Sequence, residues 1–179
     1  MPTRKTLPPQ HHLQACFTYD PETGEFRWRE RPREHFNKDT EHRRWNTRYA
    51  GTVAGRLDNR GRRAVGIDGL FYQAHRLIWK LMTNEEPQEI DHRDVDPTNN
   101  RWSNLRVATH SQNAINRPIG PHSKTGFKGV YFDGRKNKFG ARIQVDNKMH
   151  SLGHYDTAQQ AHGAYCEAAQ RFFGGFWHP

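Results

Sequence analysis

The middle of the chain contains four polar side chains that together could hydrolyse a phosphodiester bond. Asp91 and His92 directly follow Ile90, and Asn104 precedes the segment 105–109. Asn113 follows that segment closely. Hydrolysis needs a base that deprotonates water and a cation that stabilises charge on the phosphate and the leaving oxygen. An imidazole can be that base, and carboxylate and amide oxygens are hard ligands that suit Mg²⁺.

Two strands and a helix must position these side chains. We expect one strand to end on Asp91 and His92, and a second to run from Leu105 to Thr109. Thr109 and Gln112 form a capping-box pattern, so a helix begins there and Asn113 lies in its first turn. Successive strand residues point to opposite faces, so His92 would not compete with Asp91 for a metal.

This pattern resembles the HNH endonucleases of the phage and intron homing type, which have a ββα-metal core. The resemblance covers about residues 13–116, and its specific motifs are Asp91-His92, Asn104-Leu105-Arg106, Asn113 and the upstream His75-Arg76-Leu77. It implies that His92 is the general base and that Asn104 hydrogen-bonds its imidazole. It also implies that Asp91 and Asn113 hold Mg²⁺ or another divalent cation such as Mn²⁺. His110 is an alternative to Asn113, because the family accepts His or Asn at the third position.

The charge of the chain favours a polyanionic partner. Lys and Arg number 28 against 19 Asp and Glu, which gives a formal net charge of +9 and an isoelectric point near 9.9. Between Arg27 and Arg63 there are twelve Lys and Arg against five Asp and Glu. Double-stranded DNA is therefore the expected partner, although a solvated basic surface would give the same count. The basic residues of this domain that we expect to contact DNA are Arg43, Arg44, Arg101 and Arg106.

Composition argues against membrane and disulfide-rich classes. Hydrophobic residues make up 33% of the chain and mean hydropathy is −1.10. No window is apolar enough to span a bilayer, and residues 1–12 lack the apolar core of a signal peptide. We therefore expect a cytoplasmic protein, which could be phage-encoded and act in a bacterial host. Cys16 and Cys166 form no CxxC pair, so no zinc ribbon is expected and both should be small buried apolar residues.

The remaining histidines are expected to have no catalytic role. His75 begins a helix, so a structural role is expected for it. Surface positions are expected for His11, His12, His35, His42, His122, His162 and His178.

The fold class is α+β with two domains. The predicted segments are a flexible tail at 1–12, the HNH domain at 13–117, a Pro/Gly-rich linker at 118–123 and a DNA-binding domain at 124–179. The HNH domain should contain a small hairpin around the 20–24 turn and an irregular Arg-rich stretch after it. A β-meander with strands at 52–57, 64–67 and 70–73 and a packing helix at 74–83 should follow.

The C-terminal domain should be a three-stranded antiparallel sheet covered by one helix. Strands are expected at 129–133, 139–145 and 150–155, with a helix at 157–173. Polar side chains alternate with apolar ones in the middle strand, so one sheet face can enter a DNA groove. The segment 123–173 resembles the AP2 DNA-binding domain in Phe127-Lys128-Gly129-Val130, Phe139-Gly140-Ala141-Arg142-Ile143 and Leu152-Gly153-His154-Tyr155-Asp156-Thr157-Ala158. The expected DNA contacts are Lys128, Tyr131, Arg135, Lys138, Arg142 and Gln144.

These features predict a metal-dependent DNA endonuclease. One active site per chain predicts a monomer that nicks one strand at a preferred site, and the second module would add affinity. A non-catalytic DNA-binding regulator built on an HNH-derived scaffold is an alternative, as is a basic packaging protein. Intact Asp91, His92, Asn104 and Asn113 favour the enzyme.

Overall fold

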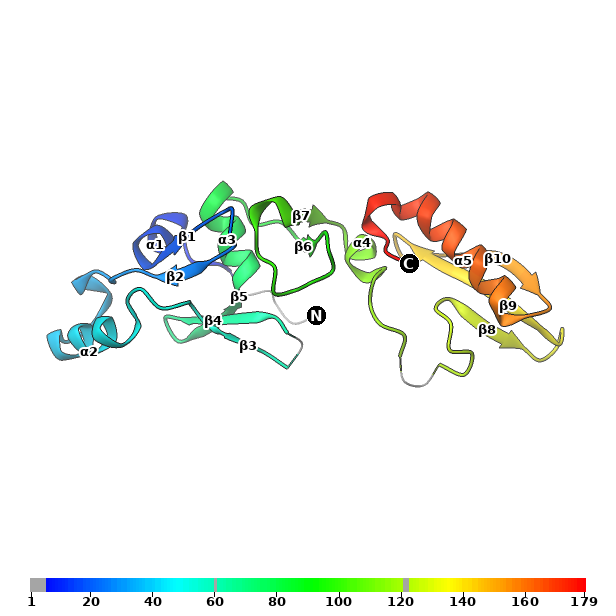
Figure 1. Ribbon diagram of the computed structural model, residues 1–179, viewed down its shortest axis with the longest axis horizontal. Coiled ribbons are helices and arrows are strands. Elements are labelled where there is room, and N and C mark those ends of the chain that lie inside the picture. Colours follow the sequence, from blue (N-terminus) through cyan, green and yellow to red (C-terminus); the bar gives the residue numbers. More distant parts are fainter. Residues whose placement is uncertain (1–5, 60, 121–122) are drawn as a thin grey trace. The chain divides into compact units, whose positions relative to one another are not determined.

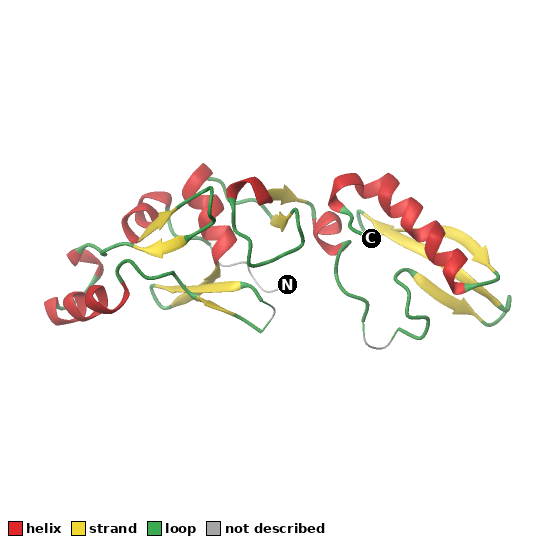
Figure 2. Ribbon diagram, viewed as in Figure 1, coloured by secondary structure: helices red, strands yellow, loops and turns green. Residues whose placement is uncertain are grey.

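The chain folds into two compact units of mixed α and β structure with small sheets (Figures 1 and 2). The computed structural model describes residues 6–59, 61–120 and 123–179. Unit 1 is Met1–Val107 and unit 2 is Ala108–Pro179. None of the described helices is both long and apolar enough to cross a membrane.

Unit 1 is built from short elements around one apolar core. Its helices are α1 (Gln10–Cys16), η1 (Arg33–His35), α2 (Asp39–Tyr49), α3 (Ala74–Thr83) and η2 (Trp102–Asn104). Its strands are β1 (Phe17–Tyr19), β2 (Phe26–Trp28), β3 (Arg56–Leu57), β4 (Arg63–Ile67), β5 (Leu70–Gln73), β6 (Glu89–His92) and β7 (Leu105–Ala108, whose last residue belongs to unit 2). They form three sheets, with strand orders β1-β2, β3-β4-β5 and β6-β7.

Aromatic side chains of the β1-β2 hairpin form the centre of this core. The Phe17 ring lies 4.4 Å from the Phe26 ring and 4.3 Å from the Trp28 ring, and all three are buried. Phe17 pairs with Trp28 across the antiparallel ladder, so the two rings share one face. Such stacked aromatic pairs add about 0.5–1.5 kcal/mol beyond their burial.

The predicted meander and the helix behind it are both present. Asp68 and Gly69 have φ values of 51° and 77°, which are the left-handed conformations that a tight two-residue hairpin turn requires. α3 has the predicted bounds, and it buries Ala74, Leu77 and Ile78. Apolar residues at this spacing place one face of the helix in the core.

Two predictions for the N-terminal part are wrong. Residues 1–5 lie outside the described residues, but Leu7 is buried and α1 begins at Gln10, so this part of the expected flexible tail is folded. The Arg-rich stretch is not irregular, because it contains α2. α2 buries no residue, although Trp45 and Tyr49 pack against the core, so it lacks the apolar stripe that would have revealed it.

Unit 2 contains the predicted sheet and helix. Its elements are α4 (His110–Ala114), β8 (Val130–Asp133), β9 (Lys138–Val145), β10 (Lys148–Tyr155), α5 (Ala158–Phe173) and η3 (Gly174–Phe176). β9 lies between β8 and β10, and both pairs are antiparallel. Thr157 and Gln160 form the predicted capping box of α5. Figure 1 shows α5 along one face of the sheet, where Ile143, Tyr165 and Phe173 form the core.

The two units divide upstream of the predicted linker. The division falls between Val107 and Ala108, whereas the linker was expected at 118–123, of which 121–122 lie outside the described residues. The segment after β7 is bonded to unit 2 through side chains. The Asp146 amide donates to Ser111 Oγ at 3.0 Å, and Asn116 Nδ2 donates to the Phe176 carbonyl at 2.6 Å.

Candidate active site

His92 is held at the end of β6 by a hydrogen bond to an asparagine. The imidazole is only 8% exposed, and its Nε2 lies 3.3 Å from Oδ1 of the equally buried Asn100. Asn100 Nδ2 donates to the Thr98 carbonyl at 3.4 Å, which orients the amide so that Oδ1 faces the ring. The Tyr19 hydroxyl donates to the Asn100 carbonyl at 2.8 Å and fixes the backbone there.

This contact selects one tautomer of His92. An amide oxygen can only accept a hydrogen bond, so Nε2 must be the protonated nitrogen. Nδ1 then has the free lone pair that a general base needs. Asn100 therefore orients the imidazole and assigns its proton.

Burial keeps His92 neutral. The pKa of His92 is lowered from its ordinary value by burial, while the hydrogen bond that the ring donates to Asn100 and the charges of Asp91 and Asp94 act in the opposite direction. The ring of His75 packs against it edge-on at 5.2 Å. Burial lowers the pKa of His75 to about 3, and the proximity of His92 adds to this. Two neutral rings in contact suit a base at neutral pH.

Asn104 holds the loop after β6, and not the imidazole as the sequence predicted. Its Nδ2 donates to Asp94 Oδ1 at 2.9 Å and to the Asn99 carbonyl at 2.8 Å. Its Oδ1 accepts from the Asp94 amide at 3.0 Å. Both amide protons are thus used, and the partner of His92 is Asn100. The hydrogen bonds from Asn99 and Asn104 lower the pKa of Asp94 against the opposing effect of burial.

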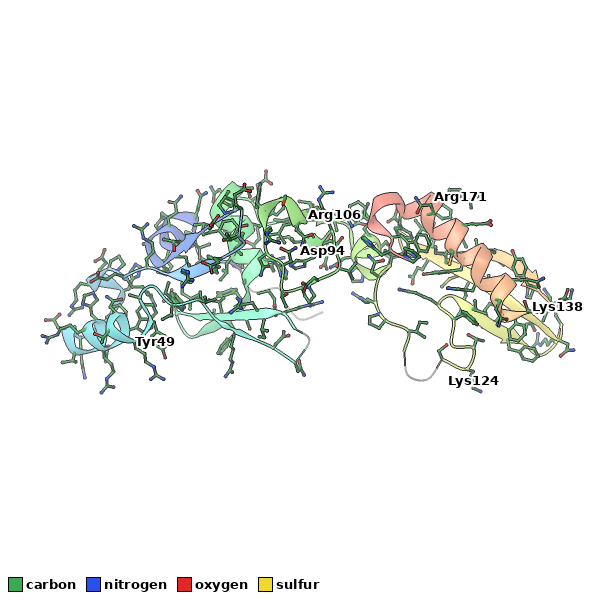
Figure 3. The ribbon with its side chains drawn as sticks, in the orientation of Figure 1. Tyr49, Asp94, Arg106, Lys124, Lys138 and Arg171 are labelled. Carbon is green, nitrogen blue, oxygen red and sulfur yellow. The ribbon has the colours of Figure 1, made fainter. Side chains whose placement is uncertain are left out.

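Asp91 forms a buried ion pair with Arg106. Arg106 Nε donates to Asp91 Oδ2 at 2.9 Å, and Nη2 lies 2.7 Å from the same oxygen. Figure 3 shows Arg106 on β7. Arg106 is only 9% exposed, so its predicted role as a DNA contact is wrong: the guanidinium neutralises a buried carboxylate instead. Both contacts are made to Oδ2, and carboxylate oxygens are hard ligands of the kind that a divalent cation prefers.

The second expected metal ligand, Asn113, lies in unit 2. Thr109 caps α4, since its side chain accepts from the Gln112 amide while Gln112 bonds back to Thr109, as predicted. Asn113 follows in this helix, and its amide donates to the Thr109 carbonyl at 3.0 Å. Because α4 belongs to unit 2, the pairing of Asn113 or His110 with Asp91 stays a prediction.

The other basic side chains predicted in unit 1 are exposed. Arg43 and Arg44 lie on α2, and neither is buried. Arg101 is exposed too, and its Nε donates to the Glu22 carbonyl at 3.0 Å. All three can reach a phosphate backbone.

The outer face of the β8-β9-β10 sheet is polar, as its alternation predicted. Arg142 and Gln144 are exposed on β9, while Ala141 and Ile143 are buried between them. The Arg142 guanidinium lies over the Tyr131 ring, 5.1 Å from its centroid. This contact fixes the position of the guanidinium on the outer face of the sheet.

The predicted contacts at the edge of this face differ in what they bind. Lys138 Nζ lies 3.2 Å from Asp156 Oδ1, and Arg135 is exposed in the β8-β9 turn. Lys128 donates to the carbonyls of Ile115 and Arg117, so it fastens the segment after α4 and does not face DNA as predicted. Burial, with the charge of Arg117, lowers the pKa of Lys128.

The segment that contains the candidate site is similar to known proteins. Residues 72–115 match the HNH endonuclease family. A protein of Acanthamoeba polyphaga mimivirus, described as the uncharacterized HNH endonuclease L560, is 32% identical over 110 residues, which are 60% of this chain and 56% of that protein. Protein 3.8 of Escherichia phage T7 is 24% identical over 110 residues, which are 53% of this chain and 91% of that protein. The chain thus spans little more than half of the mimiviral relative, and no solved structure matches it significantly.

Proposed function

We propose that the chain is a divalent-metal-dependent endonuclease that nicks double-stranded DNA, with His92 as the general base. The observation that supports this most directly is the buried His92–Asn100 hydrogen bond next to Asp91, within the residues that match the HNH endonuclease family. In this proposal Nδ1 of His92 takes a proton from water, and Asn100 holds Nε2–H throughout.

Asp91 and Asn113 are the proposed metal ligands, with His110 as the alternative to Asn113. A bound Mg²⁺ or Mn²⁺ would stabilise the negative charge that develops on the phosphate and the leaving oxygen. Asp91 would offer such an ion a carboxylate oxygen, and the contacts of Arg106 with this carboxylate are made to Oδ2. Asn104 supports the site from the loop by binding Asp94.

Unit 2 is the proposed second DNA-binding module, with an AP2-like use of its sheet. Arg142 and Gln144 would read base edges and Lys138 and Arg135 would meet phosphates. In unit 1, Arg43, Arg44 and Arg101 would contact the backbone of the DNA. A tethered second module raises the local concentration of the first at the target, and homing or another phage process is the proposed setting.

The test compares wild-type protein with His92→Ala on supercoiled plasmid, in Mg²⁺, Mn²⁺ or EDTA. We expect relaxed circles to accumulate before linear DNA in the wild type, and the rate to fall about 10²–10⁴-fold in the variant. The matched control is His178→Ala, which changes an exposed histidine of unit 2. Equal cutting by His92→Ala, or cutting that survives EDTA, contradicts the proposal.

The ion pair of Asp91 with Arg106 favours a second candidate, a regulator that binds DNA without cutting it. A cation that already neutralises the carboxylate weakens the demand for a metal there. In that case the wild type retards DNA in gels with and without Mg²⁺, and neither plasmid nor linear DNA is cut with any divalent ion.

A further inference from the structure

Unit 1 contains a second cluster of metal-binding side chains, which shares no residue with the proposed nuclease centre. Cys16 Sγ lies 3.8 Å from His12 Nε2 and 3.7 Å from His35 Nδ1. The three ligand atoms all lie within 4.8 Å of one another. The sequence had suggested that both histidines are surface residues. It had also suggested that no zinc ribbon is encoded, because Cys16 and Cys166 form no CxxC pair.

Asp68, in the β4-β5 turn, lies next to one member of this cluster. Asp68 Oδ2 lies 2.7 Å from His12 Nε2, while Oδ1 of the same carboxylate accepts a hydrogen bond from Arg31 Nη2 at 2.8 Å. One sulfur, two nitrogens and one oxygen therefore come from α1, η1 and a turn. We propose that unit 1 binds one Zn²⁺ ion at a structural site with four ligands: His12, Cys16, His35 and Asp68.

The distances suit zinc. With a metal–sulfur bond of about 2.3 Å and a metal–nitrogen bond of about 2.0 Å, tetrahedral sulfur and nitrogen ligands lie about 3.5 Å apart. The two Sγ–nitrogen distances of 3.8 and 3.7 Å are close to this value. A Cys16 thiolate and the Asp68 carboxylate would bring two negative charges to a divalent ion, while Arg31 pairs with the other oxygen of the carboxylate. Asp68 keeps 49% of its side chain exposed, which gives the ion a route of entry.

A catalytic Cys-His-Asp relay does not fit the same atoms. In a relay the nucleophile and the carboxylate contact different nitrogens of one imidazole. Here Cys16 Sγ and Asp68 Oδ2 both face Nε2 of His12. Cys16 is also 0% exposed, so a substrate cannot reach its sulfur. An ion shared by these side chains would lie between their ligand atoms.

Arg31 already contacts two of the proposed ligands, so a bound metal ion must leave room for its guanidinium. Its Nε donates to His35 Nδ1 at 3.3 Å, which is longer than its 2.8 Å bond to Asp68. The guanidinium also lies 5.2 Å from the ring centroids of Phe36 and Trp45. Metal binding at Nδ1 therefore replaces only the weaker contact, and Arg31 keeps Asp68 and the two rings. Its hydrogen bond to Oδ1 then orients the liganding carboxylate.

The chain offers a matched control in α5. His162 Nε2 lies 3.5 Å from Cys166 Sγ, so this pair has the same sequence spacing as His12 and Cys16. Among the residues that the structure describes, only the α1 pair is part of a group of three ligand atoms. Cys16→Ser should therefore abolish zinc binding, and Cys166→Ser should not affect it.

The first measurement is the metal content of the full-length protein after dialysis, by plasma mass spectrometry. We expect about one zinc per chain in the wild type and in Cys166→Ser, and at least a tenfold loss in Cys16→Ser and His35→Gln. The proposal is overturned if the wild type retains no zinc, or if Cys166→Ser loses as much as Cys16→Ser.

Cobalt substitution of the wild type does not depend on whether a variant folds. Co²⁺ at this site should give a thiolate-to-metal charge-transfer band in the near ultraviolet and the strong visible bands of tetrahedral coordination. Co²⁺ at Asp91 would have only oxygen and nitrogen ligands and no such band. Absence of the thiolate band at one equivalent of Co²⁺ contradicts the proposal, whether or not the protein cuts DNA.

Discussion

Asn100 Oδ1 lies 3.3 Å from His92 Nε2, and both side chains are buried. An uncharged amide orients the ring without raising its pKa as far as a carboxylate would. The site is thus arranged for a neutral base that works near pH 7, and the identity of residue 100 sets the pH at which this base is lost.

Asn100→Asp should move the pH dependence of cutting to higher pH. A carboxylate beside Nε2 stabilises the imidazolium form and raises the pKa of His92, so a larger share of the base is protonated at low pH. At pH values below the pKa of His92 in both proteins, each unit by which the variant raises this pKa lowers the nicking rate about tenfold. Above pH 8 the rate of the variant recovers. The measurement is the nicking rate from pH 5.5 to 9. Asn99→Asp is the control, because Asn99 contacts Asp94 and not the ring; if it shifts the profile equally, the assignment to Asn100 is wrong.

Arg106→Met should destabilise unit 1 strongly. It leaves the Asp91 carboxylate buried without its cation, which costs about 3–5 kcal/mol. The double variant Asp91→Leu/Arg106→Met removes both charges and should recover most of that loss. Urea unfolding followed by Trp fluorescence measures this, since four of the five tryptophans lie in unit 1. If the losses of unfolding free energy in Arg106→Met and in Asp91→Leu add up to the loss in the double variant, the ion pair contributes nothing to stability.

Periodicity and capping signals predicted most of the fold. The amphipathic spacing of α3 and the capping boxes at Thr109 and Thr157 are local properties, so they are encoded in short stretches of sequence. α2 was missed because its contacts with the core are made by Trp45 and Tyr49 alone. A helix with so few apolar residues depends on its tertiary packing.

The candidate site was predicted in its residue types but not in its contacts. Asn100 and Asn104 lie in the same polar loop, and nothing in the sequence shows which amide faces His92. Arg106 was expected to bind DNA, because burial beside Asp91 depends on the pairing of β6 and β7. The His12–Cys16–His35 cluster was missed because α1 and η1 meet only in the folded chain.

His75→Gln should reduce the loss of stability in mild acid. The pKa of His75 is about 3 in the folded protein against an ordinary value of 6.5, so only the unfolded chain takes up its proton between these values. The contribution of neutral His75 to folding stability is therefore complete above pH 6.5 and is lost as the pH falls toward 3. We expect a smaller difference in Tm between pH 7.5 and pH 5 in this variant than in wild type. His178→Gln changes an exposed histidine and should leave that difference unchanged; an equal effect there would rule out His75 as the cause.

Arg142→Ala should weaken the binding of double-stranded DNA. Arg142 is exposed on the outer face of the sheet and stacked on Tyr131. Arg171 is exposed on α5 (Figure 3) and packs over Phe172. If Arg142 contacts a base, its loss costs about 1–3 kcal/mol of binding free energy and relaxes the sequence preference at one position. If it contacts a phosphate, its loss lowers the slope of the logarithm of the binding constant against the logarithm of the salt concentration by about one. Fluorescence anisotropy at several salt concentrations separates these cases, with Arg171→Ala as the control of equal charge. If both variants bind DNA as tightly as the wild type at every salt concentration, the outer face of this sheet is not the DNA-binding surface, and the basic side chains of unit 1 must supply the affinity.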